Sequence, residues 1–108
     1  KNTKFLQGDA TNLIFKNSFF DYVIENDTFH HIKNYKKAIK EVYRVLKKDG
    51  IFYLMDISKY LFIWPINLFF PPESYFSKKE LISQLEDYGF KIEKSNGNLL
   101  FFIAARKI

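Results

Sequence analysis

The part of the sequence that most constrains the fold lies in its middle, where two apolar runs flank one amphipathic run. Residues 20–25 and 51–57 are the apolar runs, and each is typical of a strand covered on both faces. Between them apolar residues recur at helical spacing, from an N-cap at Asn34 to two lysines in the last turn and a stop at Gly50. A strand, a helix and a strand in this order form a right-handed crossover that joins parallel strands. The sequence therefore predicts an α/β fold.

The flanking sequence predicts further elements. Residues 4–8 are typical of a short strand, and residues 11–18 of a connection rich in turn residues. Ser77 and Glu80 form a capping box that starts a helix, which ends at Gly89. Two apolar runs then flank an Asn-Gly-Asn turn, which predicts an antiparallel hairpin made of residues 91–95 and 99–108.

Length, charge and cysteine content limit the classes of protein. A chain of 108 residues has room for one domain with a modest core. Its net charge of +5 comes largely from basic residues spread along the predicted central helix, which we interpret as a solvated face, so no nucleic-acid partner is expected. The absence of cysteine excludes disulfides, thiolate zinc sites and thiol nucleophiles. We expect a cytoplasmic protein.

Polar clusters follow three of the predicted strands. Open α/β sheets bind ligands in the crevice outside the carboxyl ends of their strands. The clusters are therefore expected to form the rim of a binding crevice: Gly8 and Asp9, then Glu25, Asn26 and Asp27, then Asp56 and Ser58.

Four short motifs occur in a diagnostic order: FLQGDA at 5–10, SFFDYV at 18–23, FHHI at 29–32 and EVYRVLKKDG at 41–50. Their order and spacing resemble the class I S-adenosylmethionine-dependent methyltransferases, especially the group that includes the ubiquinone and menaquinone methyltransferases. The resemblance implies a Rossmann-like, mostly parallel sheet with a C-terminal antiparallel hairpin. It also implies methyl transfer from S-adenosylmethionine to a small-molecule or lipid-like acceptor.

The resemblance assigns cofactor-binding roles to four residues. Asp9 would accept a hydrogen bond from the adenine amino group, and the backbone amide of Ala10 would meet the adenine ring. Glu25 and Asn26 would line the methionine and methyl side. Simpler interpretations remain open, since Asp9 also suits a capped turn and the acids after residue 24 also suit a solvated loop.

Aromatic residues and histidines supply the remaining site candidates. His30 is the candidate catalytic residue that would take a proton from the acceptor, although packing or capping would explain it equally well. No metal is expected, because adjacent histidines diverge and no further ligand set is apparent. Methyl transfer is an in-line displacement, so alignment and water exclusion can replace an essential base. Candidate substrate contacts are Phe29, Trp64 and Tyr75.

The aromatic run at residues 60–72 is too short, and too interrupted by proline, to span a bilayer. It suits a cover over an apolar acceptor, or contact with a membrane surface. The alternative interpretations are an additional flap over the core and an interface with the rest of a longer protein.

The sequence also departs from the family pattern. No Gly-x-Gly spacing occurs among its four glycines, and the Gly-rich loop and the ribose-binding acid of the family have no counterpart. We therefore expect residues 1–108 to be a single partial domain, equivalent to the family's third strand onward. The family's strand order 3-2-1-4-5-7-6 would then leave residues 20–25 as an exposed sheet edge, which predicts self-association. A non-catalytic interaction module and a nicotinamide-dependent Rossmann oxidoreductase are the alternatives.

Overall fold

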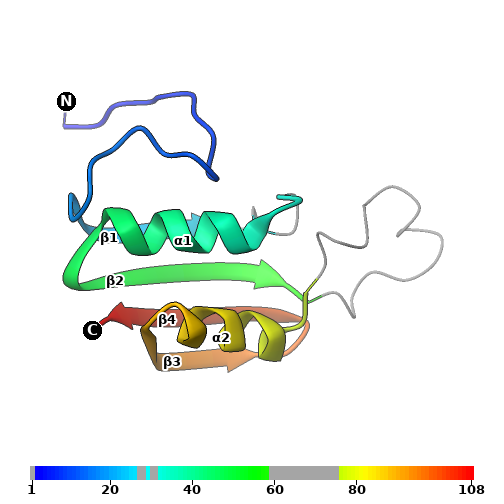
Figure 1. The fold of residues 1–108 in the computed structure, drawn as a ribbon. Helices are drawn as coiled ribbons and strands as arrows, with labels where there is room; N and C mark the ends of the chain where they lie inside the picture. Colours follow the sequence, from blue (N-terminus) through cyan, green and yellow to red (C-terminus); the bar gives the residue numbers. More distant parts are fainter. Residues whose placement is uncertain (1, 27–28, 30–31, 59–75) are drawn as a thin grey trace.

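The computed structural model describes residues 2–26, 29, 32–58 and 76–108 of the chain. In these residues one four-stranded sheet is accompanied by two helices (Figure 1). The elements in chain order are β1 (Phe20–Asn26), α1 (Tyr35–Val45), β2 (Leu46–Ile57), α2 (Lys78–Asp87), β3 (Phe90–Gly97) and β4 (Leu100–Lys107).

The strand order is β1-β2-β4-β3. β1 and β2 are parallel and are joined through α1, whereas β2 pairs with β4 and β4 with β3 in the antiparallel sense. The α/β class and the C-terminal hairpin are therefore confirmed. The order also matches the last four strands of the expected family sheet, and β1 forms one edge, as predicted for residues 20–25.

Both helices lie over the same face of the sheet, and the core sits between them and the strands (Figure 1). Ile39 of α1, Phe52 of β2 and Leu81 of α2 are fully or almost fully buried there. The opposite face is open in the described residues, and Tyr22 and Ile24 of β1 are 61% and 75% exposed. In the described residues, residues 20–25 are therefore covered on one face only, and cover on the second face stays a prediction.

The helix α1 begins as predicted but ends early. Asn34 is its N-cap and accepts a hydrogen bond from the amide of Lys37. The helix ends at Val45, because buried Leu46 is already extended and starts β2, so the two lysines expected in its last turn lie in the strand. Lys107 of β4 supplies the positive charge at the end of the helix instead. Its Nζ donates to the carbonyls of Tyr43 and Leu46, each at 2.7 Å.

Gly50 has a different role from the predicted helix stop. A Cβ atom there would lie 2.8 Å from the carbonyl oxygen of Lys47 and 3.0 Å from that of Asp21. Glycine thus allows the start of β2 to approach β1 closely.

The second helix and the hairpin form as the sequence predicts. Ser77 Oγ accepts from the Glu80 amide at 3.1 Å, and Glu80 Oε1 accepts from the Ser77 amide at 2.8 Å, which completes the capping box. In the hairpin, Gly97 has a positive φ of 85°, and a Cβ there would collide with the Leu100 carbonyl oxygen at 2.1 Å. Only glycine fits this turn.

The predicted strand at residues 4–8 is absent. This segment runs as coil on the β1 side of the sheet (Figure 1), and Phe5 is 93% exposed. A strand needs a neighbour for its backbone groups, and the segment does not pair with β1. The bridge between Asp9 and Asn12, just after this segment, is local and does not reach the sheet.

Candidate active site

Two buried carboxyl groups meet at the carboxyl ends of the parallel strands. Glu25 lies near the end of β1 and Asp56 near the end of β2, and they are only 8% and 4% exposed. The amide of Phe29 donates to Glu25 Oε2 at 3.0 Å and to Asp56 Oδ2 at 2.9 Å. Two carboxyl groups of adjacent strands thus hold one backbone amide at the predicted crevice rim.

This shared amide anchors the chain as it leaves β1. The ring of Phe29 packs on Phe52 with centroids 5.8 Å apart, and its carbonyl accepts from the Ile32 amide at 3.0 Å. Phe29 was predicted to contact substrate, but its side chain is 3% exposed and forms part of the core. Contact between its ring and a substrate stays a prediction.

Asn26 lies on the other side of the sheet from Glu25, because successive side chains of a strand alternate between faces. It lines a cavity of about 440 Å³ on the open face together with residues of β2, β3 and β4. The two predicted cofactor contacts of β1 therefore point to different faces of the sheet.

Asp9 is fixed in a tight polar turn. Its Oδ1 accepts from the Thr11 hydroxyl at 2.7 Å and from the Thr11 amide at 2.9 Å, and its carbonyl accepts from the Asn12 amide. The hydrogen bond from the Thr11 hydroxyl has the larger effect and that from the Thr11 amide the next, and both hold the pKa of Asp9 below its ordinary value of 3.8. A hollow of about 370 Å³ lies at this turn, with Asp9 and Ala10 among its lining residues.

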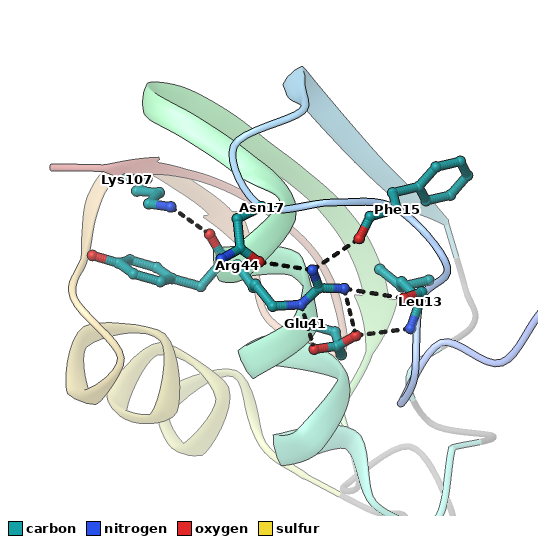
Figure 2. Close-up of polar contacts among 7 residues, drawn as sticks. Leu13, Phe15, Asn17, Glu41, Arg44 and Lys107 are labelled. Carbon is teal, nitrogen blue, oxygen red and sulfur yellow. Dashed lines mark hydrogen bonds and ion pairs between the residues drawn. The ribbon is translucent and has the colours of Figure 1, made fainter.

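A partly buried polar clamp ties the segment after Asp9 to α1 (Figure 2). The Arg44 guanidinium donates to the carbonyls of Phe15 and Leu13 at 2.8 and 3.0 Å, and to Asn17 Oδ1 at 2.9 Å. Glu41 accepts two hydrogen bonds from Arg44 and one, at 2.8 Å, from the amide of Leu13. One turn of helix α1 thereby holds the connection between the Asp9 turn and β1.

The sequence analysis missed this clamp. It counted Arg44 among the solvated basic residues, whereas the Arg44 side chain is only 30% exposed and that of Glu41 13%. The hydrogen bond from Arg44 is the main reason that the pKa of Glu41 lies below its ordinary value of 4.5. The signal available in the sequence was the spacing of three residues between opposite charges on one helix.

The predicted cofactor residues on the helix side of the sheet differ in their burial. Ala10 packs against the core cluster, and Glu25 is buried near the end of β1. Asp9 lies in the exposed turn directly before Ala10. A shared cofactor contact of these residues stays a prediction.

Other predicted site residues lie outside the described part of the chain, namely His30, Trp64 and Tyr75. Among the residues that are described, no group of three or more His, Asp or Glu could hold a metal ion. No described helix is long and apolar enough to cross a membrane. Asp56 is a rim residue that the sequence analysis noted at a strand end but did not include among the site residues.

The amino-terminal half matches known proteins in sequence. Residues 1–54 match the family model described as a methyltransferase domain. The chain is 43% identical over 56 residues to an uncharacterised methyltransferase of Bacillus subtilis, covering 52% of this chain and 22% of that protein. It is 47% identical over 53 residues to the demethylmenaquinone methyltransferase of Leptospira interrogans, and this match covers 48% of this chain and 21% of that protein. The matches span about a fifth of the length of these curated relatives.

The fold is shared over almost the whole chain. An S-adenosylmethionine-dependent methyltransferase of Thermotoga maritima superposes with a TM-score of 0.79, at 22% identity, over 95% of this chain and 63% of that one. This likeness confirms the expected Rossmann-like methyltransferase fold.

Proposed function

This chain belongs to the methyltransferase domain family, and we propose that it contributes to transfer of a methyl group from S-adenosylmethionine to a small or lipid-like acceptor. The observation that carries the proposal is the position of the buried carboxyl groups of Glu25 and Asp56 at the carboxyl ends of the parallel strands β1 and β2, where both hold the amide of Phe29. Ligands of open α/β sheets bind at this edge.

The residues present fit this cofactor. Both described hydrogen bonds to the Asp9 side chain are accepted by Oδ1, so Oδ2 is the oxygen proposed to accept from the adenine amino group. The pKa of Asp9 lies below its ordinary value of 3.8, so the group is ionised at neutral pH, and an ionised carboxylate makes the stronger hydrogen bond. Glu25 would face the methionine and methyl side, where a carboxyl group favours the positive charge of a sulfonium.

When bound, S-adenosylmethionine would supply an electrophilic methyl carbon for in-line transfer to the acceptor atom, with Asp9, Ala10 and Glu25 as the residues proposed to hold it. The chain's own contribution is to align the reactants and to exclude water. The amide of Phe29, the residue directly before His30 in the chain, is tied to Glu25 and Asp56. We keep His30 as the proposed proton acceptor.

The proposed acceptor is lipid-like. The Leptospira relative is named for demethylmenaquinone, a lipid quinone, and this supports an acceptor with a large apolar part. Trp64 and Tyr75 are the proposed acceptor contacts, and their aromatic segment is proposed to touch a membrane surface.

Residues 1–108 are proposed to supply one part of the cofactor site. The sequence contains no Gly-rich loop, so the loop that cradles the methionine would come from outside these residues. Family membership argues against a nicotinamide-dependent oxidoreductase. A non-catalytic interaction module remains the second candidate, because the open edge and open face of β1 expose Tyr22 and Ile24.

The test is transfer of labelled methyl from S-adenosylmethionine to an extracted quinone fraction by the protein as its gene encodes it. We expect label in the lipid phase, and undiminished transfer after dialysis against a chelator, because no metal ligand set is proposed. If a well-folded protein transfers no label to lipid or to small molecules, the enzymatic proposal fails and the interaction module is favoured.

A further inference from the structure

We infer that Asp56 is a positioning residue of the methyl-transfer site. Its carboxylate braces the chain that leaves β1 and thereby sets the backbone directly before His30. The brace rests on the geometry of the described residues, whereas its service to methyl transfer rests on the proposed function.

Asp56 stands in a row of β2 that is otherwise apolar. Alternate residues of a strand share a face, and Phe52 and Leu54, on the same face as Asp56, are fully buried in the core. Asp56 continues this row toward the strand end and is only 4% exposed. Removing a carboxylate from water costs free energy unless hydrogen bonds compensate for it. An acid at this position therefore indicates a specific use for its oxygens.

Both oxygens of Asp56 accept from backbone amides. Oδ1 accepts from the amide of Ile57 at 2.8 Å, which holds the carboxylate against its own strand. Oδ2 accepts from the amide of Phe29 at 2.9 Å, across 27 positions of the chain. Hydrogen bonds to an ionised acceptor belong to the stronger class. A carboxylate held in this way is suited to fixing the backbone rather than to reacting.

The brace takes over where the pairing of the two parallel strands stops. In the described residues, the register of β1 and β2 ends at Asn26 and Met55, and Asp56 is the next residue of β2. Glu25 also accepts from the amide of Phe29, at 3.0 Å. Side chains of both strands thus hold the chain after it has left the ladder.

The other groups of Phe29 are fixed as well. Its ring packs on Phe52 in the core, and its carbonyl accepts from the amide of Ile32. The next Cα atom, that of His30, lies about 3.8 Å along the chain from this anchored residue. A misplacement of about 1 Å in a reactive site can cost roughly a hundredfold in rate. Loss of the brace should therefore affect the rate of transfer more than the affinity for the cofactor.

Hydrogen exchange of the Phe29 amide tests the brace without turnover. The protein as its gene encodes it is prepared with ¹⁵N-labelled phenylalanine, and the Phe29 signal is identified by its loss in Phe29→Leu. Asp56→Leu has a similar volume but no acceptor and should accelerate this exchange at least about tenfold. Asp56→Asn keeps an acceptor oxygen and should change it less than about fivefold.

Asp49→Asn is the matched control for the loss of one charge from the same strand. Asp49 is exposed at the other end of β2, and asparagine tolerates its positive φ of 68°. This variant should leave the exchange rate of the Phe29 amide unchanged. A thermal melt of each variant establishes the temperature range in which it is folded.

The rate of methyl transfer, in the assay of the proposed function, tests what the brace serves. At saturating S-adenosylmethionine and well below the Tm, Asp56→Leu should lower kcat at least about tenfold and change the dissociation constant of the cofactor less than about twofold. Asp56→Asn should restore most of kcat. A merely structural role would lower the Tm of Asp56→Leu without lowering kcat of the folded protein.

Equal exchange rates of the Phe29 amide in wild type and folded Asp56→Leu would overturn the brace. Faster exchange with an unchanged kcat, or a tenfold loss of cofactor affinity with kcat intact, would overturn the positioning role. Faster exchange in a protein whose wild type transfers no methyl would retain the brace and contradict only the proposed function.

Asp56→Asn decides the question if Asp56→Leu does not fold. The Phe29 amide then loses a charged acceptor, so its proton resonance should move upfield, whereas Asp49→Asn should leave it in place. A resonance that stays in place in both variants would overturn the brace.

Discussion

At the scale of single residues, Arg44 is the side chain on which the position of the Asp9 turn depends most. It joins α1 to Leu13, Phe15 and Asn17, and it orients Glu41 toward the same segment. Methionine has a similar length but no donors. We expect Arg44→Met to lower the Tm by roughly 5 °C, a scale typical of losing several hydrogen bonds in a small domain. Lys40→Met, on the exposed side of α1, is the control and should leave the Tm nearly unchanged.

The pH dependence of the difference in Tm between wild type and Arg44→Met tests whether the pair of Arg44 and Glu41 contributes to it. The pKa of Glu41 is lowered in the folded state, mainly by Arg44, so its stabilising effect is present above its ordinary value of 4.5. That effect is lost as the pH falls through the lowered value. The difference in Tm between wild type and Arg44→Met should therefore narrow below about pH 4.5. A difference that stays constant from pH 7 to pH 3 would mean that the Glu41 pair contributes nothing.

Residue-level prediction succeeded for side chains near the ends of the two parallel strands and failed where the partner of a side chain is distant in sequence. Glu25 was visible as the first acid after an apolar run, and it does lie at the sheet edge. The hydrogen bonds of Arg44 reach residues 27 to 31 positions away, which no local pattern encodes. Likewise, the core position of Phe29 follows from the carboxyl groups that hold its amide.

At the scale of elements, β1 is an open sheet edge, and we expect a second copy of the chain to pair with it. Antiparallel pairing about Tyr22 would place Phe20 opposite Ile24 and Asp21 opposite Val23. Pairing about Val23 would instead oppose Asp21 and Glu25, two acids, which is unfavourable. The expected dimer is therefore centred on Tyr22, with two apolar contacts of Phe20 and Ile24 related by the two-fold axis.

Single cysteine substitutions test this register directly, because the 108-residue sequence contains no cysteine. Residues opposite each other in an antiparallel pair have Cβ atoms about 4.5–5.5 Å apart, close to the span of a disulfide. Tyr22→Cys should cross-link on mild oxidation faster than Val23→Cys or Ile24→Cys, as measured on non-reducing gels. Met55→Cys, off the edge, is the control. A monomer by sedimentation at high micromolar concentration, with no preference among the cysteines, would contradict this pairing.

The elements themselves were predictable to the extent that their stability is local. Capping and periodicity identified α1 and α2, and the Asn-Gly-Asn turn identified the hairpin. The strand expected at residues 4–8 depends on a neighbour that the described chain does not offer, so its local pattern was insufficient. The end of α1 was misjudged because burial of Leu46 in the sheet outweighs the helix signal of the lysines that follow.

At the scale of the whole molecule, the chain provides a rim of acids and a turn at Asp9, but no Gly-rich loop. We expect the 108-residue chain by itself to bind S-adenosylmethionine too weakly for a measurable calorimetric titration, because the methionine part would lack its cradle. Micromolar binding by a monodisperse monomer would show that these residues suffice. The relatives' greater length is consistent with further parts of the site elsewhere.

The most direct measurement of the central claim is the affinity for S-adenosylmethionine of the protein as its gene encodes it, with and without the Asp9 carboxylate. We predict that Asp9→Ala raises the dissociation constant at least about tenfold, as expected for loss of a charged hydrogen bond to the adenine amino group. Asp21→Ala removes an exposed carboxylate that forms a 3.4 Å ion pair with Lys47. This control should change the dissociation constant less than about twofold. Equal affinities of wild type and Asp9→Ala would contradict the assignment of this turn to the cofactor.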